Sequence, residues 1–225
     1  MCYHYLAIRS VIAIMGFLPE ICAMSIYLIR HTTPLIEKGI CYGQLDLDVT
    51  DSFEEEAVQI QNALPSAIEQ VYSSPLIRCQ KLAGFLFPEH NISFEPDLME
   101  LACGEWEGIH WDAIAPEVID PWMKDFVNVC IPGGESYVQM HKRVTGCFTR
   151  IIESSKPVAI VTHGGVIRSI LAYITQTPLV DSFGAFKINY GCVMQLQATP
   201  AGFQYKALHN ITTEKEQHKP SNFKK

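Results

Sequence analysis

Several well-known catalytic motifs are missing from the sequence. It contains no G-x-x-x-x-G-K-[ST] stretch, which excludes a P-loop enzyme, and no G-x-G-x-x-G stretch, which excludes a dinucleotide-binding Rossmann enzyme. It also lacks the G-x-S-x-G turn on which α/β-type serine hydrolases carry their nucleophile. The His-Gly-Gly stretch at 163–165 therefore has no serine partner of that kind, and it must serve another chemistry.

Positive charge is scarce. Lysine and arginine together number 17 against 24 aspartates and glutamates, so the formal net charge is −7 at pH 7. This balance argues against non-specific binding of nucleic acid and against binding to an acidic membrane surface, because both depend on an excess of cations. Any anionic ligand must therefore be held by a local cluster of cations and not by the field of the whole protein.

The eight cysteines form no recognisable framework. No C-x-x-C pair occurs, and the residues are spread along the chain as Cys2, Cys22, Cys41, Cys79, Cys103, Cys130, Cys147 and Cys192. This spacing fits neither a zinc site nor a compact set of disulfides. We therefore expect reduced cysteines that act as small apolar residues in a cytoplasmic protein, with no metal site and no cofactor.

No apolar run is long enough to span a membrane. The longest candidate near the N-terminus, residues 11–18, is too short, although it could pass for a weak signal peptide. The alternative is that residues 1–23 precede a true start at Met24, and we favour it because residues 24–29 are typical of the first strand of a domain. Residues 209–225 are polar and lysine-rich, and we expect a flexible tail there.

The remaining chain, residues 24–208, has the pattern of one α/β domain. Short apolar runs typical of strands buried on both faces occur at 26–29, 67–72 and 158–162. Amphipathic helical patterns occur between them at 53–64, 76–87 and 135–153, and prolines follow each of them. Two late runs, 192–198 and 203–208, predict a hairpin at the end of the sheet. Strands that alternate with helices predict a mostly parallel central sheet.

Polar residues follow three of the predicted strands. Arg30 and His31 come after the first strand, and His163 comes directly after the run 158–162. Arg78 is predicted one turn into the helix after the strand 67–72, with Pro75 in the first turn of that helix. Gly164 begins a helix whose free N–H groups favour an anion. Since ligands of such folds lie at the carboxyl ends of the strands, these residues together predict a phosphate pocket.

Five stretches together resemble the histidine phosphatase superfamily, which has the phosphoglycerate-mutase-like fold. They are "LIRHT" (28–32), "YSSPLIRCQKLA" (72–83), "ELACGEWEG" (100–108), "PGGES" (132–136) and "VTHGGVIRSIL" (161–171), and they occur in the family order. The resemblance implies a three-layer α/β/α sandwich around the mostly parallel sheet. The stretch "GICYGQLDLDV" (39–49) further resembles the branch of α-ribazole 5'-phosphate phosphatases.

The resemblance also implies roles for individual residues. His31 would be the nucleophile that forms a phosphohistidine, and Arg30, Arg78 and His163 would bind the phosphate oxygens, which planar guanidinium groups match well. Glu100, at the head of its motif, would give a proton to the leaving oxygen and later take one from water. Glu105 and Glu107 are rivals for that role on sequence alone.

The substrate-binding residues are less well defined. The family signature R-H-G is replaced by Arg-His-Thr, so Thr32 offers a backbone N–H and a hydroxyl where a glycine is usual. Tyr42 and Gly43 are expected at the mouth of the pocket. Trp106 and the two tryptophans that follow it, Trp111 and Trp122, could stack on a flat base or could simply pack beneath a long loop.

These residues predict a phosphomonoesterase that acts on a small phosphorylated metabolite, with α-ribazole 5'-phosphate as the first candidate. A broad-specificity acid or sugar phosphatase and a phosphoglycerate mutase are the alternatives from the same superfamily. A module that only binds phosphate is disfavoured, because it would not need both His31 and Glu100. The sequence leaves a homodimer open.

Overall fold

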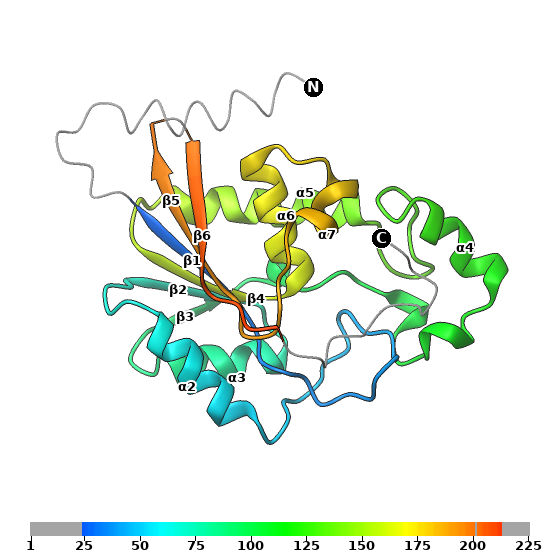
Figure 1. Ribbon diagram of the computed structural model, residues 1–225, viewed down its shortest axis with the longest axis horizontal. Coiled ribbons are helices and arrows are strands. Elements are labelled where there is room, and N and C mark those ends of the chain that lie inside the picture. The colour runs from blue at the N-terminus through cyan, green and yellow to red at the C-terminus, as the bar shows by residue number, and fades with distance from the viewer. Residues whose placement is uncertain (1–23, 201, 213–225) are drawn as a thin grey trace.

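The computed structural model describes residues 24–200 and 202–212, so the predicted N-terminal extension and most of the predicted tail lie outside the described residues (Figure 1). Six strands form one sheet in the order β3-β2-β4-β1-β5-β6. They are β1 (Ser25–Arg30), β2 (Gln70–Ser73), β3 (Ile92–Phe94), β4 (Val158–Thr162), β5 (Val193–Thr199) and β6 (Gly202–His209). The first four run parallel to one another, whereas β5 is antiparallel to both of its neighbours, β1 and β6. The predicted mostly parallel sheet and terminal hairpin are confirmed.

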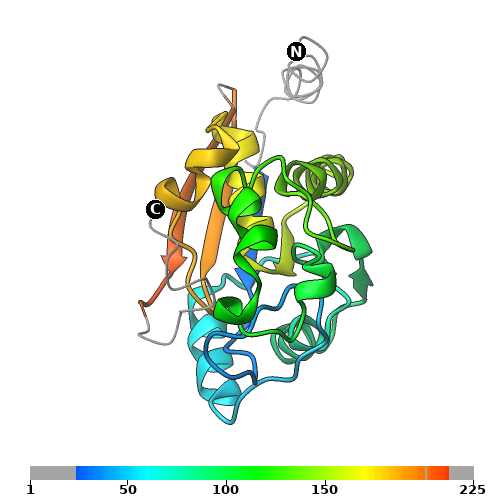
Figure 2. The same cartoon turned by 90° about the vertical axis from the view of Figure 1, so that its right-hand side faces the viewer.

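Helices cover both faces of this sheet. The helices are α2 (Phe53–Ala63), α3 (Ile77–Leu86), α4 (Pro116–Lys124), α5 (Tyr137–Ile152), α6 (Gly164–Thr175) and α7 (Ser182–Ala185). Short 3-10 turns occur at Pro96–Leu98, Gly104–Trp106, Trp111–Ala113 and Leu179–Asp181. Helices α2 and α3 lie on one face and α5 and α6 on the other, as two roughly perpendicular views make clear (Figures 1 and 2). This is the predicted three-layer α/β/α sandwich.

The two halves of the core follow from the alternation of side chains along the strands. In β1, Tyr27 and Ile29 belong to the buried cluster under α2 and α3, whereas Ile26 and Leu28 belong to the cluster under α5 and α6. Successive strand residues point to opposite faces, so an unbroken apolar run is what a strand covered on both sides requires. All five residues of β4 are buried for the same reason.

Two predicted boundaries are corrected by the structure. Strand β2 begins at residue 70 and not at 67, because its partner β4 begins only at Val158 and the N–H groups of Glu69 and Gln70 both bond to the carbonyl of Pro157. Helix α3 begins after Leu76, which places Pro75 before the helix. Arg78 is therefore the second residue of α3 and not a full turn in.

Some elements were not predicted. Strand β3 is only three residues long, and α4 contains Pro121 within it and Pro116 at its start. Proline usually interrupts a helix, so the sequence around Pro121 does not predict one. Within residues 24–200 and 202–212, no helix has the length and apolar character needed to cross a membrane.

Candidate active site

Two histidines meet at the edge of the sheet where β1 and β4 end. Arg30 and Thr162, the last residues of the two strands, lie opposite each other, and each is followed directly by a histidine. The backbone N–H of His31 donates to the carbonyl of Thr162 at 3.0 Å, and the ring centroids of His31 and His163 are 5.1 Å apart. The structure therefore brings together the two imidazoles that the sequence pattern places at one rim.

The ring of His31 is held in one tautomer. Its Nδ1 lies 2.7 Å from the carbonyl oxygen of Thr32, and the ring is 2% exposed. A carbonyl oxygen only accepts hydrogen bonds, so Nδ1 carries the proton and Nε2 of the neutral ring keeps a lone pair. This is the state in which an imidazole can attack phosphorus. Thr32 thus contributes its carbonyl to the site.

Arg30 reaches the same place from the end of β1. Its Nη1 donates to the carbonyl of Ile188 at 2.6 Å, and the side chain lines the cavity beside His31. A Cβ atom on Gly164 would lie 3.2 Å from both Cζ and Nε of Arg30. Gly164, which the sequence pattern singled out for its N–H group, therefore also leaves room for this guanidinium.

Arg78 lies deeper, with no exposed surface. Its Nη1 donates to the carbonyl of Leu45 at 2.8 Å, and its Nη2 donates to the carbonyl of Gly43 at 2.6 Å. Nη2 also lies 3.3 Å from Nδ1 of His163. Charge-assisted bonds of this kind fix the guanidinium against the imidazole of His163.

His163 is neutral in this setting. Burial, followed by the charge of Arg78 and the neighbouring His31, lowers the pKa of His163 well below its ordinary value. Since a guanidinium only donates, Nδ1 of His163 accepts from Arg78, and Nε2 donates to the hydroxyl of Ser74 at 2.8 Å. In this arrangement His163 orients Arg78, with Ser74 fixing the imidazole from the other side.

Glu100 binds the N-terminus of α6. One carboxylate oxygen accepts from the N–H of Gly165 at 3.0 Å, and the other accepts from the N–H of Leu101 at 3.0 Å. A Cβ atom on Gly165 would lie 2.2 Å from Oε1 of Glu100, so only glycine allows this approach. Gly164 was predicted from the sequence as a site residue and Gly165 was not, although both belong to the same Gly-Gly pair.

The structure separates Glu100 from its two rivals. The carboxylate of Glu107 accepts bonds from four backbone N–H groups, those of Gly43, Gln44, Leu45 and Cys103, at 2.8 to 3.0 Å. Glu105 is exposed. Glu107 therefore holds the loop that carries Tyr42, and of these three glutamates only Glu100 lines the cavity.

The cavity has a volume of about 220 Å³ and a lining of two kinds. We call Arg30, His31, Glu100 and Gly165 the polar end of its lining. The apolar and aromatic part of the lining consists of Leu101, Cys103, Trp111, Trp122, Phe126, Tyr137, Met140 and Phe183. Tyr42 and Arg168 lie on the lining as well. The other predicted site residues do not line it and lie behind the lining or beside it: Thr32, Gly43, Arg78, Trp106, His163 and Gly164.

The three tryptophans differ in their relation to the cavity. Trp111 and Trp122 stack on each other, with centroids 5.8 Å apart and planes 22° apart, and both line the cavity. Trp106 is 3% exposed and packs edge-on against both of them at 6.0 and 5.6 Å. Trp106 is therefore packing support, and its two neighbours form the surface that a ligand can touch. Gly43 also packs closely, because a Cβ there would lie within 2 Å of the carbonyl of Leu101.

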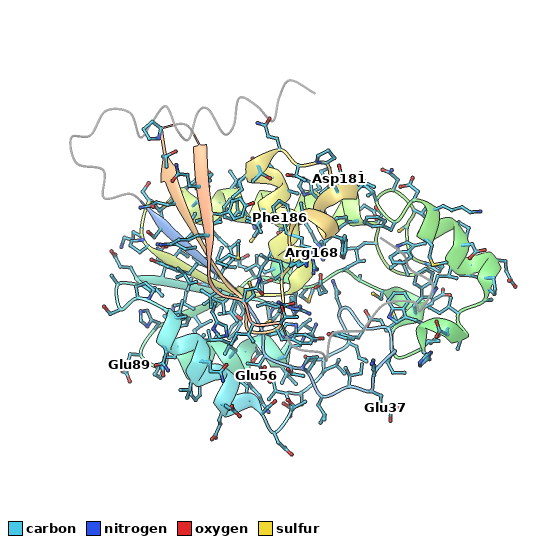
Figure 3. All side chains as sticks on the ribbon, viewed as in Figure 1. Glu37, Glu56, Glu89, Arg168, Asp181 and Phe186 are labelled. Atoms are coloured by element: carbon cyan, nitrogen blue, oxygen red, sulfur yellow. The ribbon has the colours of Figure 1, made fainter. Side chains whose placement is uncertain are left out.

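Two further residues of the site were not found from the sequence. Arg168 occurs in the quoted stretch "VTHGGVIRSIL", and its position four residues after Gly164 could have placed it on the same side of α6. Its Nε donates to the carbonyl of Phe186 at 3.2 Å, and the two labelled residues lie close together where α6 meets α7 (Figure 3). Tyr190 packs on Arg30, with its ring centre 4.0 Å from Cζ. No motif or periodic pattern in the neighbouring sequence indicates this role.

A metal site is not evident within residues 24–200 and 202–212, since no three histidine, cysteine, aspartate or glutamate side chains there gather closely enough to bind an ion. The cationic groups at the polar end belong instead to arginine.

Comparison with known proteins places the chain in a family. The model of the histidine phosphatase superfamily (branch 1) matches residues 26–211. The chain is 33% identical over 165 residues to a metal-independent phosphoserine phosphatase of Arabidopsis thaliana, covering 67% of this chain and 68% of that protein. It is 31% identical over 158 residues to phosphoglycerate mutase-like protein 4 of the same plant, covering 64% and 68%.

Solved structures share the fold. The α-ribazole phosphatase from Shigella flexneri superposes with a TM-score of 0.73 at 22% sequence identity, covering 88% of this chain and all of that one. At this level of identity, the similarity concerns the fold.

Proposed function

Because the chain belongs to the histidine phosphatase superfamily (branch 1), we propose that it hydrolyses phosphomonoesters through a phosphohistidine on His31. The observation that supports this most directly is the position of His31 in one cavity with Glu100 and Arg30. Its Nδ1 proton is bound to the carbonyl of Thr32, so Nε2 has the lone pair that in-line attack requires.

The reaction needs two steps. In the first, Nε2 of His31 forms a bond to phosphorus, the bond to the leaving oxygen breaks, and a protonated Glu100 gives its proton to that oxygen. In the second, water attacks the phosphohistidine, Glu100 takes a proton from it, and the P–N bond breaks. Inorganic phosphate and an alcohol leave, and His31 and Glu100 return to their starting states.

Positive groups offset the charge of the phosphoryl group during both steps. Arg30 lines the cavity, and Arg78 lies against His163, which holds its orientation. The N-terminus of α6 adds N–H groups of its own, one of which binds Glu100. Planar guanidinium forks suit the equatorial oxygens of the transferring group, which is where electrostatic stabilisation contributes most.

We further propose that the leaving group is large, flat and mostly apolar, and that α-ribazole 5'-phosphate is the physiological substrate. The stacked pair Trp111 and Trp122, with Phe126 and Phe183, offers an aromatic surface for a benzimidazole ring. The similarity of residues 39–49 to the α-ribazole phosphatase branch favours the same substrate.

A second candidate is a phosphomonoester whose leaving group carries a carboxylate. Arg168 lies on the lining, with its guanidinium 4.8 Å from the ring centre of Phe183, and could bind such a group. The matching phosphoserine phosphatase of Arabidopsis thaliana favours this alternative by its name.

Two variants distinguish these candidates. Phosphate release would be measured for α-ribazole 5'-phosphate, phosphoserine and 3-phosphoglycerate with the wild type, Trp111→Leu and Arg168→Met. If α-ribazole 5'-phosphate is the substrate, it has the highest kcat/KM with the wild type, and Trp111→Leu lowers that value about tenfold, as expected for loss of one stacking surface. If phosphoserine is preferred and only Arg168→Met reduces its hydrolysis, the second candidate replaces the first.

The proposed covalent route has its own test. The His31→Ala variant should release no phosphate from any of these esters, yet it should still bind vanadate, because Arg30 and Arg78 remain. Phosphate release by this variant at the wild-type rate would rule out His31 as the nucleophile.

We also propose that the protein acts in the reducing environment of the cytoplasm. Free thiols are present at Cys41, Cys79, Cys103, Cys130, Cys147 and Cys192, and most of them are buried among apolar residues. Mass spectrometry of protein isolated with its thiols blocked should find these cysteines reduced.

A further inference from the structure

Tyr190 lies directly behind the polar end of the cavity. It is 5% exposed, and its ring centre is 4.0 Å from Cζ of Arg30 and 5.6 Å from the ring centre of His31. A guanidinium on the face of an aromatic ring is attracted by the ring quadrupole, most strongly where water is excluded. The ring of Tyr190 is therefore a platform for Arg30.

The hydroxyl of Tyr190 connects this platform to the other side of the site. It lies 2.6 Å from the hydroxyl of Tyr42, whose own ring centre is 5.6 Å from Cζ of Arg78. Each of the two arginines thus has a tyrosine ring near its guanidinium, and the two tyrosines bond to each other.

The tyrosine pair also joins two loops that are distant in sequence. Tyr42 belongs to the entrance loop, residues 33–50, which Glu107 holds from one side and Glu56 from the other through the N–H of Thr33. Tyr190 belongs to residues 186–192, whose backbone bonds to β1 through Gly191 N–H to His31 O and Arg30 N–H to Cys192 O. The hydroxyl contact is therefore a bridge between these two loops.

The hydroxyl of Tyr42 stays protonated in this setting. Burial, as the largest cause, together with the neighbouring Tyr190 raises the pKa of Tyr42 well above its ordinary value. Its neutral hydroxyl can therefore hold the 2.6 Å contact with Tyr190, and the ring distances to Arg30 and Arg78 indicate a geometric role for the pair. Two cations held close together repel each other, and the carbonyl oxygens and ring faces around them offset that repulsion.

We infer that Tyr42 and Tyr190 form one positioning unit, which holds Arg30 and Arg78 at the spacing required to bind a phosphoryl group. This inference rests on the proposed function, and neither tyrosine takes part in bond making. Tyr190 supplies the platform, and the hydroxyl bond to Tyr42 fixes its place relative to the entrance loop.

A double-mutant cycle tests the bridge. Tyr42→Phe and Tyr190→Phe each remove the same hydrogen bond while keeping the ring, so each should weaken vanadate binding and lower kcat/KM about two- to tenfold. The double variant should lose no more than either single variant, because only one interaction is shared. Losses that simply multiply in the double variant would show two independent effects and would overturn the inference.

The platform is tested with Tyr190→Leu, which removes the ring itself. Vanadate affinity and kcat/KM should fall about ten- to thirtyfold, a larger loss than in Tyr190→Phe, which keeps the ring. The ratio of rates for good and poor leaving groups should stay unchanged, since Glu100 is untouched. Phe94→Leu, at an exposed aromatic residue of β3, is the control and should behave as the wild type.

If the folded Tyr190→Leu variant binds vanadate as tightly as the wild type, the ring of Tyr190 is not a platform for Arg30. If that variant does not fold, the double-mutant cycle with the phenylalanine variants tests the inference instead. Vanadate binding, measured by calorimetry, needs no turnover. A protein that hydrolyses none of the tested esters but still shows the coupled losses would therefore refute the proposed function and leave the positioning unit standing.

Discussion

The chemical role of each site residue depends on which of its atoms carries a proton. The proton of His31 is directed at the carbonyl of Thr32, and the proton of His163 is directed at Ser74. Glu100 accepts backbone N–H groups with both of its oxygens. Two predictions follow from these assignments, one on the acid and one on the buried imidazole.

The Glu100→Gln variant should be slow with poor leaving groups. Glutamine cannot give a proton, so the first-turnover release of an alcohol from an alkyl phosphate should fall about a hundredfold, whereas release of p-nitrophenol should fall only a few-fold. Rapid-quench measurement of the first turnover separates this step from the later attack of water. Glu105→Gln, at an exposed carboxylate, is the control. Equal losses on both esters would point to a different acid.

The stability of the protein should fall at acidic pH because of His163. Its pKa is depressed in the folded state relative to about 6.5 in the unfolded chain, so the unfolded state binds more protons below that value. The stabilising contribution is present above about pH 6.5 and is lost as the pH falls towards the folded-state pKa. Urea unfolding at pH 7.5 and 5.5 measures the loss, and His163→Gln should reduce it. An identical pH dependence in the variant would assign the effect to other groups.

At the level of secondary structure, the start of α6 is the most constrained element. The Gly164-Gly165 pair allows both Arg30 and Glu100 to approach the first turn, and helix residues of ordinary size would block them. The close contacts of Arg30 and Glu100 explain why glycine, which destabilises helices, occurs twice at the beginning of this buried helix.

Gly165→Ala should therefore displace Glu100. We expect a ten- to hundredfold loss of kcat with alkyl phosphates and a much smaller loss with p-nitrophenyl phosphate, as for Glu100→Gln. Gly146→Ala is the control, because a Cβ there meets nothing within 4 Å, and it should stabilise α5 by up to about 1 kcal/mol. If Gly165→Ala keeps full activity on alkyl phosphates, the contact between α6 and Glu100 has no part in the reaction.

For the whole molecule, the main question is whether water or a second substrate oxygen receives the phosphoryl group. A mutase must keep water from the phosphohistidine and bind two isomers of one small acid. Here residues 109–131 supply an apolar wall through Trp111, Trp122 and Phe126, which offers little to orient a glycerate in two ways.

Hydrolysis should therefore dominate. Incubation with 3-phosphoglycerate and 2,3-bisphosphoglycerate should release inorganic phosphate and yield little 2-phosphoglycerate, which a coupled assay for each product measures in parallel. The His31→Ala variant is the control for adventitious phosphatase. Formation of the isomer faster than free phosphate would replace the phosphatase proposal with the mutase alternative.

The sequence alone determined the layers of the fold and the rim of the site. Apolar runs such as β4 and the helical patterns after them are local signals, and parallel strands necessarily bring their carboxyl ends together. That is why His31 and His163, which directly follow two such strands, could be placed side by side without coordinates. Arg78 was placed by the same reasoning, with a small error in helix start.

Only the tertiary structure decided which residues complete the site. The bond between Tyr42 and Tyr190 spans 148 positions, and the bond between Gly165 and Glu100 spans 65. No periodic pattern encodes such pairs, because they form only after the loops are held against the sheet by contacts elsewhere in the chain. The same holds for Trp106 and Trp111, which look alike in sequence and differ only in which of them the folded chain turns toward the cavity.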